Sequence, residues 1–171
     1  MEGPNIMLFT FLRRFGWFVL LVLVQALILN KISFFGYATP FLYVYLILAF
    51  DANISRYSLL LGGFALGVAV DIFSNTPGVN AAATTLLAFM RPSLLRLFTP
   101  RDSADDFSPS ILSMGTSPYI RYLTFCLMFH QTALILLLTF SLVQPHVIVL
   151  KIVSSILLTG LCILGVEQIR K

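Results

Sequence analysis

The sequence predicts an all-α polytopic membrane protein with about six transmembrane helices in one domain. Hydrophobic residues make up 58% of the 171 positions, charged residues only 11%, and the mean hydropathy is +0.95. Apolar runs alternate along the chain with short polar or turn-forming segments. A chain of this length has room for about six crossings of roughly 20 residues and for no separate soluble domain. We therefore expect residues 1–171 to form a single integral membrane domain.

The first three apolar runs cover residues 15–29, 41–50 and 57–73. The first run follows Arg13 and Arg14 but precedes no small-residue cleavage pattern, so we expect a retained helix rather than a removed signal peptide. The second run is too short to cross a hydrocarbon core of roughly 30 Å. It must borrow polar neighbours, sit short in the bilayer or be buried by other helices.

A tight helical hairpin is expected where the third run meets the fourth, which covers residues 79–90. The intervening segment 74–78, Ser-Asn-Thr-Pro-Gly, has the composition of a turn. Pro77 fixes its own φ, and Gly78 can adopt a positive φ without a steric penalty. The two runs should therefore lie antiparallel and in contact.

Proline marks the end of the fourth run and the long segment that follows it. The dipeptide 91–92, Arg-Pro, predicts a break or kink, and any continuation to Phe98 would then be interfacial. Residues 99–118 are rich in proline, serine and aspartate, which predicts a flexible cytoplasmic loop. The fifth and sixth apolar runs cover residues 119–143 and 147–166.

The distribution of basic residues predicts the orientation of the chain. With six crossings, nine lysines and arginines fall on the side of the N-terminus and two on the other side. The positive-inside rule then places both termini in the cytoplasm. We expect Arg91, Arg96 and Arg101 to lie at the cytoplasmic surface, where they could attract anionic lipid, at about 1 kcal/mol per charge, or a cytoplasmic filament. For each arginine alone, the simpler interpretation is a solvated flank of its helix.

Asp71 is the only acidic residue inside an apolar run. An ionisable residue within a membrane segment is a functional hypothesis by default, for proton coupling or substrate binding. The alternative is structural: the carboxylate caps the exposed N–H groups at the start of the fourth run, where the chain reads Pro77 to Asn80. We favour the capping interpretation because Asp71 lies near the outer end of its helix.

Small residues predict close packing around Asp71. Gly63, Gly67 and Asp71 are spaced by four and therefore share one helix face. A Gly-x-x-x-Gly pair allows close approach of another helix in a lipid environment. The alanine and threonine face at 81–85 should also pack closely.

Polar residues also occur midway along two other runs, namely Gln25 in the first and His130 with Gln131 in the fifth. They could form a polar track for a proton or a small ligand. The simpler interpretation, which we favour, is interhelical hydrogen bonding.

The sequence contains no pattern that points to an enzyme, a cofactor or a metal. It offers no nucleophile with a base, no phosphate-binding glycine loop and no paired carboxylates. Cys126 and Cys162 both lie in apolar runs without a second ligand at suitable spacing, so we expect them to act as packing residues. The scattered basic residues are better explained by topology than by nucleic-acid binding.

The segment around Asp71 resembles the signature of the MreD family of rod shape-determining membrane proteins. The likeness extends to the N-terminal arginine pair, the Gly-Tyr-Ala-Thr-Pro turn at 36–40, the six apolar segments and the length. The residues that carry it are Gly67, Asp71, Phe73, Ser74, Pro77, Gly78, Asn80 and Ala81.

The resemblance implies a multi-pass scaffold of the bacterial inner membrane that regulates cell shape and peptidoglycan synthesis within the cell-elongation machinery. Its implied partners are MreC, MreB, RodA and penicillin-binding protein 2. Members of the family are also similar in fold to the substrate-binding S components of energy-coupling-factor transporters, so a vitamin or small-molecule transporter component is the alternative. An S component would be expected to carry an Ala-x-x-x-Ala motif in its first helix, where this chain has only Ala26.

The scaffold interpretation makes a specific structural prediction. We expect the face of Gly63 and Gly67, with the short second and fourth helices, to form a recess for a partner's transmembrane helix. The hairpin from Asp71 to Asn80 would form its outer rim.

Overall fold

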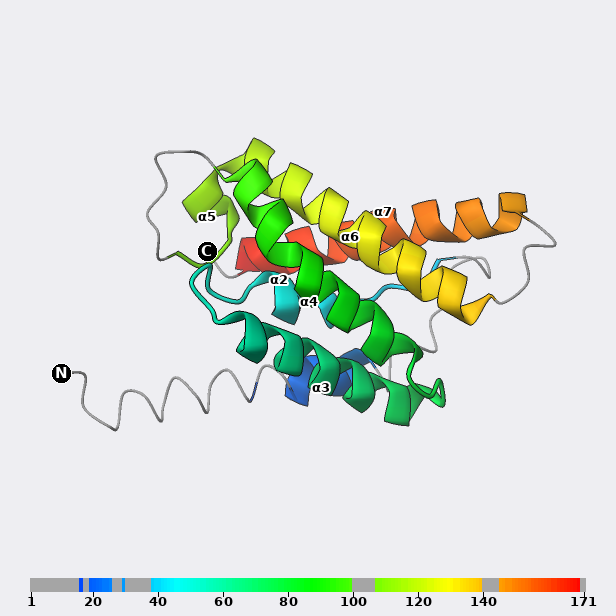
Figure 1. The fold of residues 1–171 in the computed structure, drawn as a ribbon. Coiled ribbons are helices and arrows are strands. Elements are labelled where there is room, and N and C mark those ends of the chain that lie inside the picture. The colour runs from blue at the N-terminus through cyan, green and yellow to red at the C-terminus, as the bar shows by residue number, and fades with distance from the viewer. Residues whose placement is uncertain are drawn as a thin grey trace.

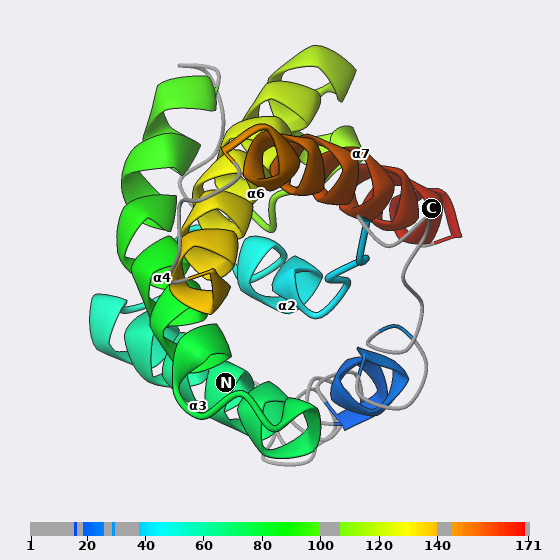
Figure 2. The same ribbon diagram turned by 90° about the vertical axis from the view of Figure 1, so that its right-hand side faces the viewer.

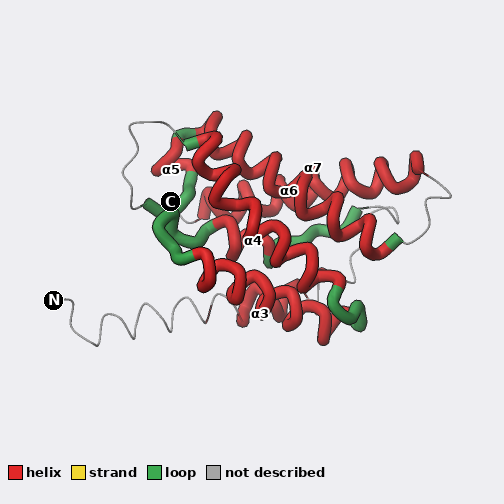
Figure 3. The backbone as a smooth tube through the Cα atoms, viewed as in Figure 1, coloured by secondary structure: helices red, strands yellow, loops and turns green. Residues whose placement is uncertain are grey.

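The computed structural model describes residues 16, 19–25, 29, 38–99, 107–139 and 145–169 of the chain. Within these ranges the protein is all-helical and contains no β-strand (Figure 3). Residues 19–25 are helical, and six further helices have defined bounds. These are α2 (Val44–Leu48), α3 (Arg56–Ser74), α4 (Val79–Phe98), α5 (Ile111–Met114), α6 (Thr116–Leu138) and α7 (Pro145–Ile169) (Figure 1).

Three of the described helices are long and apolar enough to cross a membrane: Arg56–Ser74, Thr116–Leu138 and Pro145–Gln168. They confirm the all-α class and indicate a membrane protein. Helix α4 is comparable in length, with 20 residues, but it carries two arginines and is less apolar. The count of six crossings and the orientation of the chain stay predictions.

Helix α2 occupies the centre of the bundle. Figure 2 shows it surrounded by α3, α4, α6, α7 and the helical residues 19–25. Four of its five residues are buried, namely Val44, Tyr45, Ile47 and Leu48. The second apolar run is thus a short helix that other helices bury, one of the three outcomes expected from its length. Irregular backbone at membrane depth is tolerated where the protein itself covers it.

The turn between α3 and α4 contains two left-handed residues, of which the sequence predicted Gly78. Helix α3 ends at Asn75, which has a φ of 54° and donates its N–H to the carbonyl of Asp71. Helix α4 begins at Gly78, whose φ is 82°. Both residue types adopt this conformation more readily than others, so the hairpin prediction is confirmed.

Helix α4 continues through Pro92 to Phe98 without ending, so a break at Pro92 is excluded, and a kink there stays a prediction. Proline removes one helical hydrogen bond, but packing can retain the helix when neighbouring helices cover it. Ala88 and Leu95 are buried on either side of Pro92. The final turn is closed by Thr99, whose N–H and hydroxyl both donate to the Leu95 carbonyl, at 2.9 and 2.7 Å.

The long loop expected at 99–118 is partly folded. Ser110 and Ser113 form a reciprocal capping box that starts α5, and α6 begins at Thr116. The Phe107 carbonyl accepts a hydrogen bond from the Ala52 N–H at 2.8 Å, which ties this segment to the loop before α3. Residues 100–106 lie outside the described part of the chain.

Candidate functional site

Asp71 caps the N-terminus of α4 from the preceding helix. Its Oδ1 accepts the backbone N–H of Asn80 and its Oδ2 accepts that of Ala81, both at 2.9 Å. These N–H groups belong to the second and third residues of α4, whose N-cap Gly78 has no side chain to offer. A carboxylate at this end is also favoured by the helix dipole. The capping interpretation of Asp71 is therefore confirmed.

The same carboxylate organises the polar side chains of the turn. Thr76 donates its hydroxyl to Asp71 Oδ1 at 2.9 Å. The side-chain amide of Asn80 donates to that oxygen and to the Thr76 oxygen, both at 2.9 Å. Asp71 is only 6% exposed, yet both of its oxygens are satisfied. The turn is thus closed by bonds within one short stretch of chain.

Gly63 and Gly67 allow α3 and α4 to touch through their backbones. A Cβ atom on Gly67 would lie 2.4 Å from the Cα of Ala81 and 2.6 Å from its nitrogen, which is too close for any side chain. A Cβ on Gly63 would lie 3.0 Å from the Cβ of Ala88. The Thr84 hydroxyl adds a hydrogen bond to the Gly63 carbonyl at 2.8 Å.

This contact corrects the expected location of the recess. Helix α4 of the same chain occupies the face of Gly63 and Gly67, so that face is not open to a partner's helix. The physical reason is that the antiparallel hairpin places the small residues of the two helices opposite each other. Ala81 and Thr84 fill the space that the glycines leave.

A buried polar chain runs inward from the turn. Tyr43 donates its hydroxyl to Asn80 Oδ1 at 2.8 Å, and the Tyr43 hydroxyl oxygen lies 3.2 Å from His130 Nε2. The rings of Tyr43 and His130 meet edge to face, 5.7 Å apart. The two side chains have no exposed surface. This series of hydrogen-bonded side chains connects α3, α4 and α6 with the segment that precedes α2.

Other polar residues hold the extended backbone that leads into α2. Gln25 donates to the Pro40 carbonyl and accepts from the Leu42 N–H, both at 2.9 Å. Thr159 Oγ1 accepts from the Phe41 N–H at 3.1 Å and from the Gln131 amide at 3.3 Å. Of the interhelical hydrogen bonding expected of these residues, the bond from Gln131 on α6 to Thr159 on α7 joins two helices. Gln25 instead binds the backbone of the segment before α2.

Arg91 lies inside the bundle, so its expected place on a basic surface is wrong. It is only 1% exposed. Its guanidinium donates to the carbonyl of Leu48 at 3.3 Å, to the carbonyl of Phe50, and to the hydroxyl of Tyr122 at 3.1 Å. The C-terminal carbonyls of a short buried helix need donors, and the cation also suits the negative end of the dipole. Of its expected companions, Arg96 is exposed and Arg101 lies outside the described residues.

Sequence reasoning missed a second buried contact near the same end of the bundle. Tyr45 on α2 donates its hydroxyl to Glu167 Oε2 at 2.8 Å, and the first N–H of α5, that of Ile111, donates to Oε1 at 3.3 Å. Glu167 is 3% exposed. A carboxylate that directly follows a long apolar run was the available signal. Tyr43 and Thr159 gave no such signal, since each stands alone among apolar neighbours.

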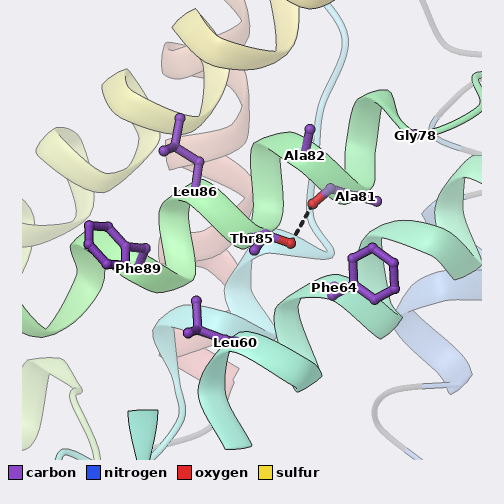
Figure 4. A pocket seen from close by; sticks show the side chains of 8 residues that line it. All are labelled: Leu60, Phe64, Gly78, Ala81, Ala82, Thr85, Leu86 and Phe89. Carbon is purple, nitrogen blue, oxygen red and sulfur yellow. Dashed lines mark hydrogen bonds between the residues drawn. The ribbon is translucent and has the colours of Figure 1, made fainter. Parts of the chain in front are cut away.

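The outer side of the hairpin carries an apolar groove of about 550 Å³ between α3 and α4 (Figure 4). The single hydroxyl on its lining, that of Thr85, donates to the Ala81 carbonyl at 2.7 Å and offers no free polar group. The lining residues are Leu60, Phe64, Gly78, Ala81, Ala82, Thr85, Leu86 and Phe89.

The remaining motif residues form the exposed end of the hairpin. Phe73 is 55% exposed, and Pro77 and Gly78 are also exposed. A second recess of about 350 Å³ lies beside them, with Asp71 and Asn75 among its lining residues. The motif therefore divides into a buried half that builds the turn and an exposed half at its rim.

Among the described residues, no group of three histidines, cysteines, aspartates or glutamates could hold a metal ion. Cys126 is buried and Cys162 is half-buried, and neither is in a disulfide. No protein-family model, curated protein or solved structure matches the chain. The described residues thus form an all-helical fold, with three helices long and apolar enough to cross a membrane, a capped helical hairpin on one side and a short buried helix at its centre.

Proposed function

We propose that the protein is a scaffold of the bacterial cell-elongation machinery, of the MreD type, which acts by binding partner proteins in the inner membrane. One observation carries the proposal. The residues that resemble the MreD signature, from Gly67 to Ala81, build a single capped hairpin in which Asp71 and Asn80 are used for architecture. Such a motif supports a shaped surface rather than a reaction.

The apolar groove on the outer side of the hairpin is the proposed docking surface. It lies between α3 and α4, so its occupant would have to be apolar and within the bilayer. A single transmembrane helix, as MreC would supply, meets this requirement. The small residues Ala81 and Ala82 form part of the lining, and Phe64 and Phe89 add large side chains. This groove replaces the glycine face as the predicted recess.

The other partners follow from the family resemblance and from the predicted orientation. With both termini in the cytoplasm, the exposed Arg96 would face anionic lipid or the filament protein MreB. RodA and penicillin-binding protein 2 would join through the membrane assembly. No residue of this chain would take part in peptidoglycan chemistry.

A transporter S component is the second candidate, and the broken helix at the bundle centre is the observation that favours it. Discontinuous helices line the substrate and ion sites of many transporters. Here, however, the guanidinium of Arg91 already binds the carbonyl of Leu48 at the end of α2 and that of Phe50 just beyond it. Gln25 and Thr159 are likewise bonded to the chain itself. We therefore favour the scaffold.

Filling the groove tests the proposal. Ala82 is exposed within the groove, whereas Ala65 is exposed on α3 and does not line it. We expect Ala82→Trp to abolish co-purification of MreC and to fail to restore rod shape in depleted cells. Ala65→Trp, at equal abundance in the membrane, should behave as the wild type. Equal recovery of MreC with both variants would contradict the docking surface.

Depletion separates the two candidate functions. Loss of a cell-elongation scaffold should turn rods into spheres, because peptidoglycan synthesis is no longer directed along the cell. Loss of an S component should instead leave cell shape intact and create a requirement for a vitamin. The second outcome would overturn the scaffold proposal.

A further inference from the structure

The buried polar chain from Asp71 to His130 has a fixed direction, which can be derived donor by donor. Asp71 acts as an acceptor in each hydrogen bond made by its carboxylate, toward Thr76, Asn80 and Ala81. The Asn80 side chain must therefore turn its NH₂ group toward Asp71. Its Oδ1 then points the other way, toward Tyr43.

The next link follows from the single proton of a phenol. Tyr43 donates that proton to Asn80 Oδ1 at 2.8 Å, since an amide oxygen can only accept. The Tyr43 oxygen has no second proton for His130, which lies 3.2 Å away through Nε2. The contact is a hydrogen bond only if Nε2 carries a proton and donates it. His130 is thus the Nε2–H tautomer.

The other ring nitrogen is then a bare acceptor. His130 has no exposed surface, and its Nδ1 has no hydrogen-bond partner among the described residues. Phe41 and Tyr43 both meet the imidazole ring edge to face, at 6.4 and 5.7 Å. Of these two neighbours only Tyr43 can titrate, and its proton is already committed to Asn80.

We propose that Asp71 is a positioning residue for His130: acting through Asn80 and Tyr43, it sets the tautomer of an imidazole on a different helix and presents Nδ1 as an acceptor inside the bundle. The polar chain therefore does more than cap α4. The position of the hairpin determines the hydrogen bonding of a side chain in the core, through Asp71, Asn80, Tyr43 and His130. This inference does not depend on the proposed function, because it concerns the direction of hydrogen bonds alone.

Nitrogen NMR of the full chain in lipid bilayers tests the tautomer directly. The protein contains two histidines, so selective ¹⁵N-histidine labelling gives two imidazole signal sets. His146 is exposed and outside the polar chain, and His146→Gln assigns its signals. In the wild type we expect His130 to show a protonated Nε2 and an unprotonated Nδ1. A protonated Nδ1 with a bare Nε2 would overturn the proposal without any variant of the chain.

Variants of Tyr43 and Asp71 test whether these residues set the tautomer of His130. Tyr43→Phe removes the acceptor for Nε2–H, and we expect loss of the single tautomer and the appearance of both. Asp71→Asn should have the same effect, because the Asn80 amide is then free to reverse. Tyr45→Phe is the matched control, since Tyr45 donates to Glu167 and lies outside the polar chain. A single unchanged Nε2–H tautomer in folded Tyr43→Phe would contradict the assignment.

Discussion

The hairpin of α3 and α4 and the short helix α2 are stabilised in opposite ways. The carboxylate of Asp71 reaches partners only 5 to 10 positions along the chain. The segment of α2 depends on side chains that are 15 to 118 positions away, among them Gln25, Arg91 and Thr159. A local motif can therefore build the hairpin, whereas the centre forms only when the rest of the bundle has assembled.

The hairpin and the centre of the bundle also bury charges of opposite sign. In the hairpin, a negative group meets the N-terminus of α4. At the centre, a positive group meets the carbonyl of Leu48, the last residue of α2, and the carbonyl of Phe50 just beyond it. Each side chain replaces a cap that the helix itself does not supply, and each is matched to the sign of the dipole. Asp71 and Arg91 thus both act as structural caps, each on a helix end of opposite sign.

Arg91→Met should produce the largest loss of stability. It leaves the carbonyls of Leu48 and Phe50 and the hydroxyl of Tyr122 without their charged donor. Hydrogen bonds to charged groups contribute about 1.5–3 kcal/mol each, so the free energy of unfolding should fall by roughly 3 kcal/mol or more. Thermal unfolding in detergent measures the change.

Arg91→Lys separates the contribution of the positive charge to stability from that of the planar guanidinium. A lysine retains the positive charge but lacks the planar fork that reaches several acceptors. We expect an intermediate loss of stability. A fully stable Arg91→Met protein would show that α2 does not need its distant partner.

Gly67→Ala should be the next most damaging change. The new methyl group would meet the backbone of Ala81, which cannot move without shifting α4. Overpacking of this kind costs about 1–3 kcal/mol. Gly62→Ala is the matched control on the same helix, because its Cβ would meet only the Phe50 ring at 3.7 Å. Equal thermal stability of the two variants would contradict the close approach of α3 and α4.

Substitution of Asp71 should cause the smallest loss of stability of the three sites, and the loss should depend on whether the new side chain can accept a hydrogen bond. Asp71→Ala removes the cap of α4, a loss of about 0.5–2 kcal/mol. Asp71→Asn retains one acceptor and should lose less. Both variants should remain inserted and restore rod shape in part, as a cap predicts. Complete loss of function in a stable Asp71→Asn protein would instead favour a proton relay.

The sequence was sufficient to predict the hairpin because its signals are local. The Pro-Gly turn, the four-residue spacing of Gly67 and Asp71 and the carboxylate near a helix start all lie within one short stretch. Their interpretation requires only turn geometry and helix periodicity. Which face of the hairpin stays exposed was less predictable, since the spacing of Gly63 and Gly67 does not reveal that α4 covers them.

The centre of the bundle could not be predicted in the same detail. The length of the second apolar run indicated a helix too short to cross a membrane, but nothing near it in sequence identifies Arg91 or Thr159 as partners. Arg91 was interpreted as a surface charge because the positive-inside rule counts residues without regard to burial. Pro92 was interpreted as a break or kink for a similar reason, since the local preference of proline takes no account of tertiary packing.

Amide hydrogen exchange in lipid bilayers tests the contrast between the two regions most directly. In the wild type, the amides of residues 45–49 should exchange as slowly as those in the buried part of α6, although α2 has only five residues. Arg91→Met should accelerate exchange in residues 45–49 and leave the Asn80 and Ala81 amides protected by Asp71. Rapid exchange of residues 45–49 in the wild type would contradict the account, because distant side chains would then not be holding α2 in place.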